Sequence, residues 1–313
     1  MLCELAYSFP SRIAELLERD RGLTRNFREE TVTDLLMASL VGLEAFGIRV
    51  DFPDEPTTGG DMDWIYAAPL EINGGRYLRC ILQAKRAQFA KLKTSGYWYY
   101  HHLDHGTPAG QQAQTLIAHA STSPGGMATL PLYILYHPTS ALAPMARGRP
   151  AIDGVNLVFA HHVAPVVLGG CTRREKKVDY WRDRFMSLSE ILCWPAAVTA
   201  PRAPGAPGAT QFMVGPAQAA LPDLTGGFHP DLVAQRFRQQ RERMATPIVP
   251  DASSPPPIEP ADGIPPDVRR AIEGQVTKED RKKLKRPRVI LSTRLRRGDP
   301  DFSRAAQLNR RRG

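Results

Sequence analysis

A tight turn at Asn73-Gly74-Gly75 constrains the fold of this chain more than any other feature of its 313 residues. Two segments rich in aromatic and aliphatic residues flank the turn, DMDWIYAAPL at 61–70 and RYLRCILQAK at 76–85. An Asn-Gly step between such segments is typical of a β-hairpin. We therefore expect two antiparallel strands that pair across this turn.

The second strand has two unlike faces, because side chains alternate along a strand. One face is apolar and suits a core: Leu78, Cys80, Leu82 and Ala84. The other face is mixed and ends in polar groups: Tyr77, Arg79, Ile81, Gln83 and Lys85. Reflecting the hairpin about Asn73 places Asp61 opposite Lys85, and a small shift in register places it beside Gln83 instead. One end of the hairpin therefore gathers a carboxylate, a carboxamide and an ammonium group.

Segments on both sides of the hairpin predict an α/β domain over residues 1–194. Apolar residues recur at helical spacing in one segment: Val32, Leu35, Leu36, Leu40 and Leu43. We also expect helices over 11–20 and 110–120, strands over 48–52, 130–136 and 155–160, and a closing helix or turn over 186–194. This order of elements predicts a central mixed β-sheet flanked by helices.

The charge and the prolines divide the chain in two. Residues 1–194 contain 20 basic and 20 acidic residues, so residues 195–313 carry the whole net charge of +9. They also contain 17 of the 28 prolines. We expect a Pro/Ala/Gly-rich linker over 195–266 with a short helix at 230–244, then a basic tail over 267–313. Together they predict a largely disordered basic C-terminal extension.

The basic tail is a candidate nucleic-acid-binding segment, because lysine and arginine release counterions from phosphates on binding. The alternative is a flexible, solubilising tail. The candidate contacts are Lys282, Lys283, Lys285, Arg286 and Arg288, with Gln111 in the body of the domain.

Cysteine usage and hydropathy exclude several classes of protein. Cys3, Cys80, Cys171 and Cys193 form no close pair, which argues against a zinc ribbon or a disulfide scaffold and suits a reducing cytoplasm. Residues 1–20 do not resemble a signal peptide, and no segment approaches the roughly 18 apolar residues of a membrane span. We expect a cytoplasmic protein that does not contact a membrane.

The polar end of the hairpin suits a hard divalent cation, which prefers oxygen ligands and needs few carboxylates. Asp61 would anchor Mg²⁺, with the Gln83 side chain and the Ala84 backbone carbonyl as further ligands. Asp63 lies on the same face as Asp61 and could bind a second metal. Lys85 would position a water or offset charge on a phosphate. This set predicts metal-dependent phosphodiester hydrolysis.

The segments REETVTD (28–34), GGD (59–61) and QAK (83–85) together resemble the core of the PD-(D/E)XK nuclease superfamily, in its QxK variant. The series is also similar to an uncharacterised bacterial family built on this core, and the resemblance covers roughly residues 25–140. It implies a restriction-endonuclease-like core that cleaves DNA with Mg²⁺, for which Mn²⁺ substitutes. It also implies a role in bacterial defence against foreign DNA.

The resemblance places Asp61, Gln83 and Lys85 at the motif positions, with Glu29 or Glu30 as the helix glutamate. A helical wheel favours Glu29 facing the sheet, but both stay candidates. Gln83 departs from the commoner glutamate, which removes a negative charge and leaves open whether one or two metals bind.

Three other interpretations remain. The chain could be an inactive nucleic-acid-binding protein with a nuclease-like fold, or an interaction module that uses its tail to reach a partner protein. A homodimer and partner defence proteins are separate expectations. The hairpin end could also be an ordinary solvated rim. His101–His105 favours a polar loop over a metal cluster, and the aromatic run 97–100 suits either base stacking or loop packing.

Overall fold

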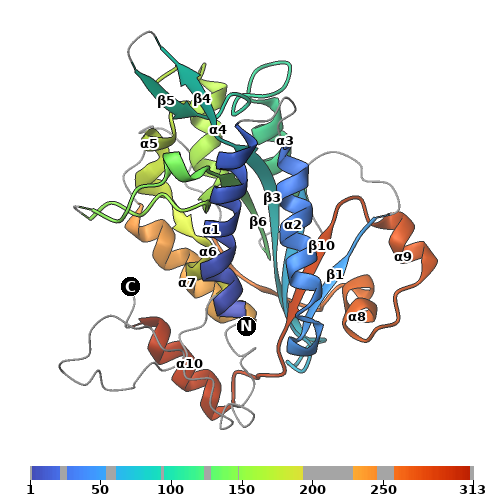
Figure 1. Ribbon diagram of the computed structural model, residues 1–313. Coiled ribbons are helices and arrows are strands. Elements are labelled where there is room, and N and C mark those ends of the chain that lie inside the picture. The colour runs from blue at the N-terminus through green and yellow to red at the C-terminus, as the bar shows by residue number, and fades with distance from the viewer. Residues whose placement is uncertain are drawn as a thin grey trace, which may run out of the picture.

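The computed structural model describes residues 2–21, 27–53, 61–92, 95–122, 128–146, 148–192, 228–244 and 257–310. It confirms the predicted α/β class: a mixed β-sheet crosses the molecule with helices packed on it (Figure 1). The sheet order is β1 (Ile48–Asp51), β10 (Arg288–Ser292), β2 (Met62–Ala68), β3 (Arg76–Arg86), β6 (Thr129–Tyr136), β7 (Val155–Phe159) and β8 (Met186–Ser187), with β9 (Ala261–Asp262) paired to β3.

The predicted hairpin is confirmed as β2 and β3, but its register is shifted by two residues. Met62 lies opposite Leu82 and Ala68 opposite Arg76, so residues 69–75 form a longer connection than an Asn-Gly turn. Within it Asn73 has a φ of 59°, a left-handed conformation that asparagine tolerates better than most residues. The shift places Asp61 beside Gln83 rather than opposite Lys85.

Apolar cores lie on both faces of the sheet, whereas the alternation in β3 predicts a core on one face only. Leu82 and Ala84 pack in one core with α1 (Leu2–Asp20) and α2 (Glu29–Val41). The other core contains Ile81 and residues of α3 (Gln111–Thr122) and α4 (Ala160–Leu168). The predicted stripe of α2 is correct except at Leu35, which is 41% exposed.

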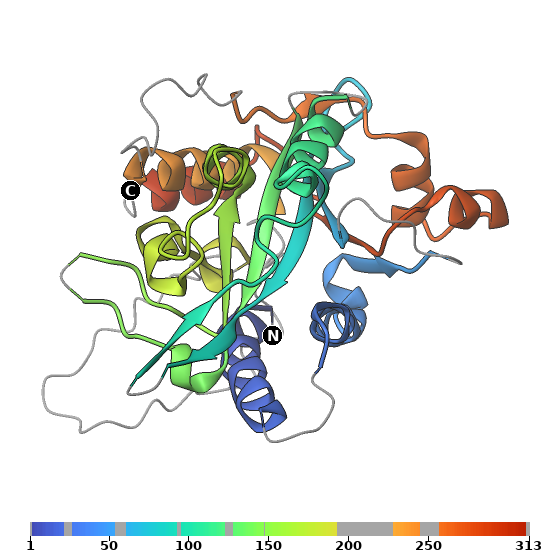
Figure 2. The same cartoon turned by 90° about the horizontal axis from the view of Figure 1, so that it is seen from above.

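Shorter elements complete the fold. They are η1 (Glu44–Phe46), β4 (Gln88–Lys91), β5 (Gly96–Tyr99), η3 (Thr139–Ala141), α5 (Val178–Trp181), η4 (Arg182–Arg184), α6 (Leu188–Leu192), α7 (Pro230–Arg243), α8 (Pro266–Ile272), α9 (Lys278–Lys283) and α10 (Pro300–Arg310). Figure 2 shows the twist of the sheet from above, with β4 and β5 (teal) extending from one end. Among the helices described, none is both long and apolar enough to cross a bilayer.

The prediction of a disordered basic tail over 267–313 is wrong, because its apolar insert forms a central strand. β10 runs antiparallel to β1 and parallel to β2, and Val289, Ile290 and Leu291 are buried. The short helix predicted over 230–244 is confirmed as α7. Within the predicted linker, residues 195–227 and 245–256 lie outside the described residues. Residues 228–229 and 257–266 are described.

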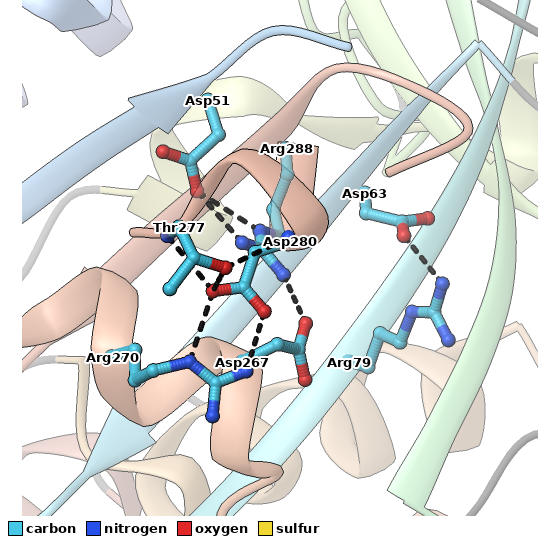
Figure 3. A network of polar contacts seen from close by, with 8 residues as sticks. All are labelled: Asp51, Asp63, Arg79, Asp267, Arg270, Thr277, Asp280 and Arg288. Carbon is cyan, nitrogen blue, oxygen red and sulfur yellow. Dashed lines mark hydrogen bonds and ion pairs between the residues drawn. The ribbon is translucent and has the colours of Figure 1, made fainter. Parts of the chain in front are cut away.

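Arg288 fixes β10 to the elements around it (Figure 3). Its guanidinium donates to Asp51 on β1 at 2.9 Å and to Asp267 on α8 at 2.6 Å. Nearby, Arg270 pairs with Asp280, which also forms a capping box with Thr277 at the start of α9. Arg288 is only 5% exposed, so the prediction that it contacts nucleic acid is wrong.

Replacing Arg288 with alanine tests this anchor. Arg288→Ala leaves the Asp51 carboxylate without its guanidinium partner, so we expect the free energy of unfolding to fall by about 3 kcal/mol in urea denaturation. The matched control is Lys282→Ala on the exposed side of α9, with an expected change within about 0.5 kcal/mol. Equal urea midpoints for both variants would contradict this role of Arg288.

Candidate active site

Beyond the end of its hairpin partner, β3 presents an edge that acidic side chains occupy. The last pair of the β2–β3 ladder is Met62 with Leu82. Past it, the Ala84 amide donates to Asp61 Oδ2, and the Arg86 amide donates to Glu29 Oε1 at 3.0 Å. Two carboxylates thus replace the missing strand and satisfy buried backbone donors.

The Ala84 carbonyl oxygen faces this same edge. In a β-strand the N–H and C=O groups of one residue point to the same neighbouring strand. The Ala84 amide meets Asp61 on the β2 side of β3, so the carbonyl of Ala84 points there as well. The edge between Asp61 and Glu29 therefore combines carboxylate and carbonyl oxygens.

Gln83 and Lys85 complete the group, as the sequence predicts. Gln83 Nε2 donates to Asp61 Oδ2 at 2.6 Å, and Lys85 Nζ lies 3.8 Å from Glu29 Oε2. Both side chains are only 3% exposed. Of the two candidate glutamates, Glu29 makes these contacts, whereas Glu30 is exposed one position further along α2.

The surroundings of Asp61 disfavour the ionised form of its carboxyl group. Burial raises the pKa of Asp61 to about 6, although the Ala84 hydrogen bond and the Lys85 charge act in the opposite direction. The negative charges of Glu29 and Glu30 add to the increase. An ionised Asp61 is therefore short of positive charge, and a cation at this edge would supply it.

The donor set fits a hard cation rather than zinc. Within the described part of the chain, no cluster of three or more His, Cys, Asp and Glu side chains is arranged to hold a metal. The oxygens of Asp61, Ala84 and Gln83 are instead the kind of partial shell that Mg²⁺ completes with water and phosphate. The Gln83 amide can present its oxygen after a 180° turn, since its nitrogen and oxygen are interchangeable in shape.

Asp63 does not join this group. It pairs with Arg79, and its Oδ1 lies 3.5 Å from Arg286 Nε (Figure 3 shows the Arg79 contact). Two guanidinium groups already neutralise this buried carboxylate, so the structure argues against the predicted second metal ligand. The sequence around Asp63 gives no sign that Arg79 and Arg286 will pair with it.

Arg286 lies closer to the site than a tail residue would. Burial lowers its pKa, and the charges of Asp63, Arg79 and Asp61 act on it. Its guanidinium therefore lies within electrostatic reach of Asp61. The other predicted basic contacts, Lys282, Lys283 and Lys285, are exposed on or after α9, where Lys283 pairs with Glu279 at 2.6 Å.

Gln111 serves the loop in front of α3 instead of the site. Its side-chain oxygen accepts a hydrogen bond from the Thr107 amide at 3.3 Å. The next residue also holds this loop, because the Gln112 amide donates to the His105 carbonyl at 3.2 Å.

Sequence reasoning missed Tyr133. It lies beside Gln83 in the β3–β6 ladder, and its buried hydroxyl has no hydrogen-bond partner among the described residues. Burial and then the charge of Asp61 raise the pKa of Tyr133. A polar hydroxyl within the apolar segment LPLYILY was the available signal.

The raised pKa of Asp61 predicts a pH-dependent gain in stability for Asp61→Asn. A carboxyl whose pKa is higher in the folded state adds stability below its unfolded pKa, and this contribution is lost as pH rises through about 6. Without divalent metal, we expect the free energy of unfolding of Asp61→Asn to exceed that of wild type by about 3 kcal/mol at pH 8. This advantage should nearly vanish at pH 4 in urea denaturation. A variant less stable than wild type at pH 8 would contradict the buried charge.

The residues that build this site all lie within a region that matches a known protein family. Residues 2–298 match the model of a family of unknown function, DUF6615. The match includes α1, α2, the hairpin and β10, so the C-terminal strand lies within the matched family region. No curated protein and no solved structure matches the chain. The chain therefore belongs to the DUF6615 family.

Proposed function

We propose that this protein is a Mg²⁺-dependent endonuclease that hydrolyses phosphodiester bonds of DNA. The observation that carries the proposal is the convergence of Asp61, Gln83 and Lys85 at one edge of β3, beside the backbone carbonyl of Ala84. Fixed oxygen ligands next to a buried ammonium suit a reaction in which negative charge develops on a phosphate.

Each side chain has a definite task in this proposal. Asp61, the Ala84 carbonyl and the Gln83 amide oxygen would hold the metal. When bound, Mg²⁺ polarises the phosphodiester and lowers the pKa of a water. Lys85 holds that water by hydrogen bonding and offsets charge on the phosphate. Glu29 keeps the Lys85 ammonium in place through their ion pair.

Three further elements of the proposal rest on the resemblance to PD-(D/E)XK nucleases and on composition. They are a role in defence against foreign DNA, activity with Mn²⁺ in place of Mg²⁺, and a cytoplasmic location. A homodimer or a defence protein as partner also stays a prediction.

Plasmid cleavage with Mg²⁺ tests the proposed activity. We expect wild type to nick and linearise supercoiled plasmid, and Lys85→Ala to lose at least about 100-fold in rate, because transition-state charge stabilisation is lost. Glu29→Gln should lower the rate by about ten-fold, since it weakens the hold on Lys85. The exposed neighbour provides the matched control: Glu30→Gln should cut at the wild-type rate. Equal cleavage rates for all four proteins would contradict the proposed active site.

Metal binding can be measured without cleavage. We expect 10 mM Mg²⁺ to raise the thermal midpoint of wild type and to leave that of Asp61→Asn unchanged, because a ligand that binds only the folded state stabilises it. Differential scanning fluorimetry with and without EDTA checks this. DNA binding without a shift in midpoint or cleavage in any divalent metal would favour the inactive nucleic-acid-binding alternative.

A further inference from the structure

The hairpin of β4 and β5 continues directly from the proposed site. β3 ends at Arg86 and β4 begins at Gln88, so Lys85 lies close to the base of this hairpin in the chain. Gln88 pairs with Tyr99 and Ala90 with Tyr97 in an antiparallel register. Figures 1 and 2 both show the two strands projecting beyond the central sheet.

A row of aromatic rings runs along one face of this hairpin and into the loop that follows. We call it the aromatic row: Tyr97, Tyr99, His101, His102 and His105. Successive ring centroids lie 5.8, 5.8, 4.4 and 5.8 Å apart, and each pair meets edge to face. The three histidines are exposed and the two tyrosines are half-buried. The exposed part of each ring can therefore contact the π-systems of a ligand.

The aromatic row leads to the catalytic edge. Burial lowers the pKa of His102, and the charges of His101, Glu29, His105 and Lys85 also act on it. Tyr99 pairs with Gln88, which follows shortly after Lys85 in the chain, so the row lies next to the proposed site at the base of β5.

Basic residues accompany the row along one side. Segment 173–177 (RREKK) runs beside β5, where Lys177 bridges Tyr99 and the Tyr100 amide donates to the Lys176 carbonyl at 2.9 Å. The Lys177 ammonium lies 4.7 Å from the centroid of the Tyr97 ring. Arg173, Arg174 and Lys177 are all exposed.

Exposed rings beside a strip of cations are what an unpaired nucleic-acid strand requires. Bases of a single strand stack on aromatic side chains while lysine and arginine track the phosphates. A duplex hides its base faces and would use only the cations. Imidazole and phenol rings accept any base, so this surface selects strandedness rather than sequence.

We infer that the aromatic row and segment 173–177 bind an unpaired strand of the DNA substrate and guide it to the edge of β3. This inference rests on the proposed function for the identity of the ligand as DNA. It makes DNA with a single-stranded end, flap or gap the preferred substrate over fully paired duplex.

Fluorescence anisotropy with a labelled 20-nucleotide poly-dT strand, in EDTA, measures this binding without cleavage. We expect Tyr97→Ala/Tyr99→Ala to weaken binding by at least about ten-fold, since each lost base stack lowers the affinity several-fold. Tyr97→Phe/Tyr99→Phe, which keeps both rings, should bind as wild type does. A blunt duplex of the same length should bind all three proteins equally. Tyr7→Ala, which removes a tyrosine 61% exposed on α1, is the control for surface aromatic loss.

A second variant keeps the test independent of how the tyrosine variant folds. Arg173→Ala/Arg174→Ala should reduce the slope of log affinity against log salt by about 0.7 for each phosphate that the variant no longer neutralises. The inference would be overturned if the folded Tyr97→Ala/Tyr99→Ala protein bound poly-dT as tightly as wild type. It would also be overturned if that protein lost affinity equally for the single strand and the duplex. Tighter binding of poly-rU than of poly-dT would overturn the assignment to DNA.

The two proposals fail separately. If Lys85→Ala cuts plasmid as wild type does, the nuclease proposal falls, whereas anisotropy in EDTA still decides whether the aromatic row binds a strand. If the aromatic row does not bind, cleavage of duplex plasmid can still depend on Asp61 and Lys85.

Discussion

An unfinished strand edge is the constraint on which the rest of this structure depends. β3 is longer than its partner β2, so the amides of Ala84 and Arg86 need acceptors that no strand provides. Carboxylates from two different elements supply them. Asp61 accepts the Ala84 amide best when it is ionised. Its burial, however, opposes that charge. The same pair of acids therefore completes the strand edge and forms part of the proposed site.

Positive charge in this molecule is divided between ion pairs that hold the fold together and the region of the proposed site. Arg288 pairs with Asp51 and joins β10 to β1, and Arg270 pairs with Asp280 and joins α8 to α9. Arg286, from the same segment, lies near Asp61 and Asp63 at the proposed site. A net charge of +9 is thus a poor guide to how much basic surface is free for a polyanion.

The parts of the site that follow from local periodicity could be predicted, and those that follow from distant pairing could not. Alternation along a strand puts Gln83 and Lys85 on one face whatever surrounds them, and an uninterrupted helix puts Glu29 near the sheet. Arg288 finds Asp51 at a separation of 237 positions, and nothing near either residue announces it. The five-residue strand β10 was masked by its basic surroundings, whose composition suggested disorder. Asp63 was misread for the same reason, since its partners come from other segments.

The position of β10 also sets an order of events during synthesis. β2 is translated long before its parallel neighbour β10, which comes from residues 288–292. Long-range parallel pairing of this kind forms late and slowly, because a large loop must close first. Residues 288–292 must therefore be translated before the central sheet can close, and a product truncated before them would expose β2 as a bare edge open to aggregation and proteolysis. For a protein proposed to cut DNA, this delay withholds a finished sheet from every incomplete copy.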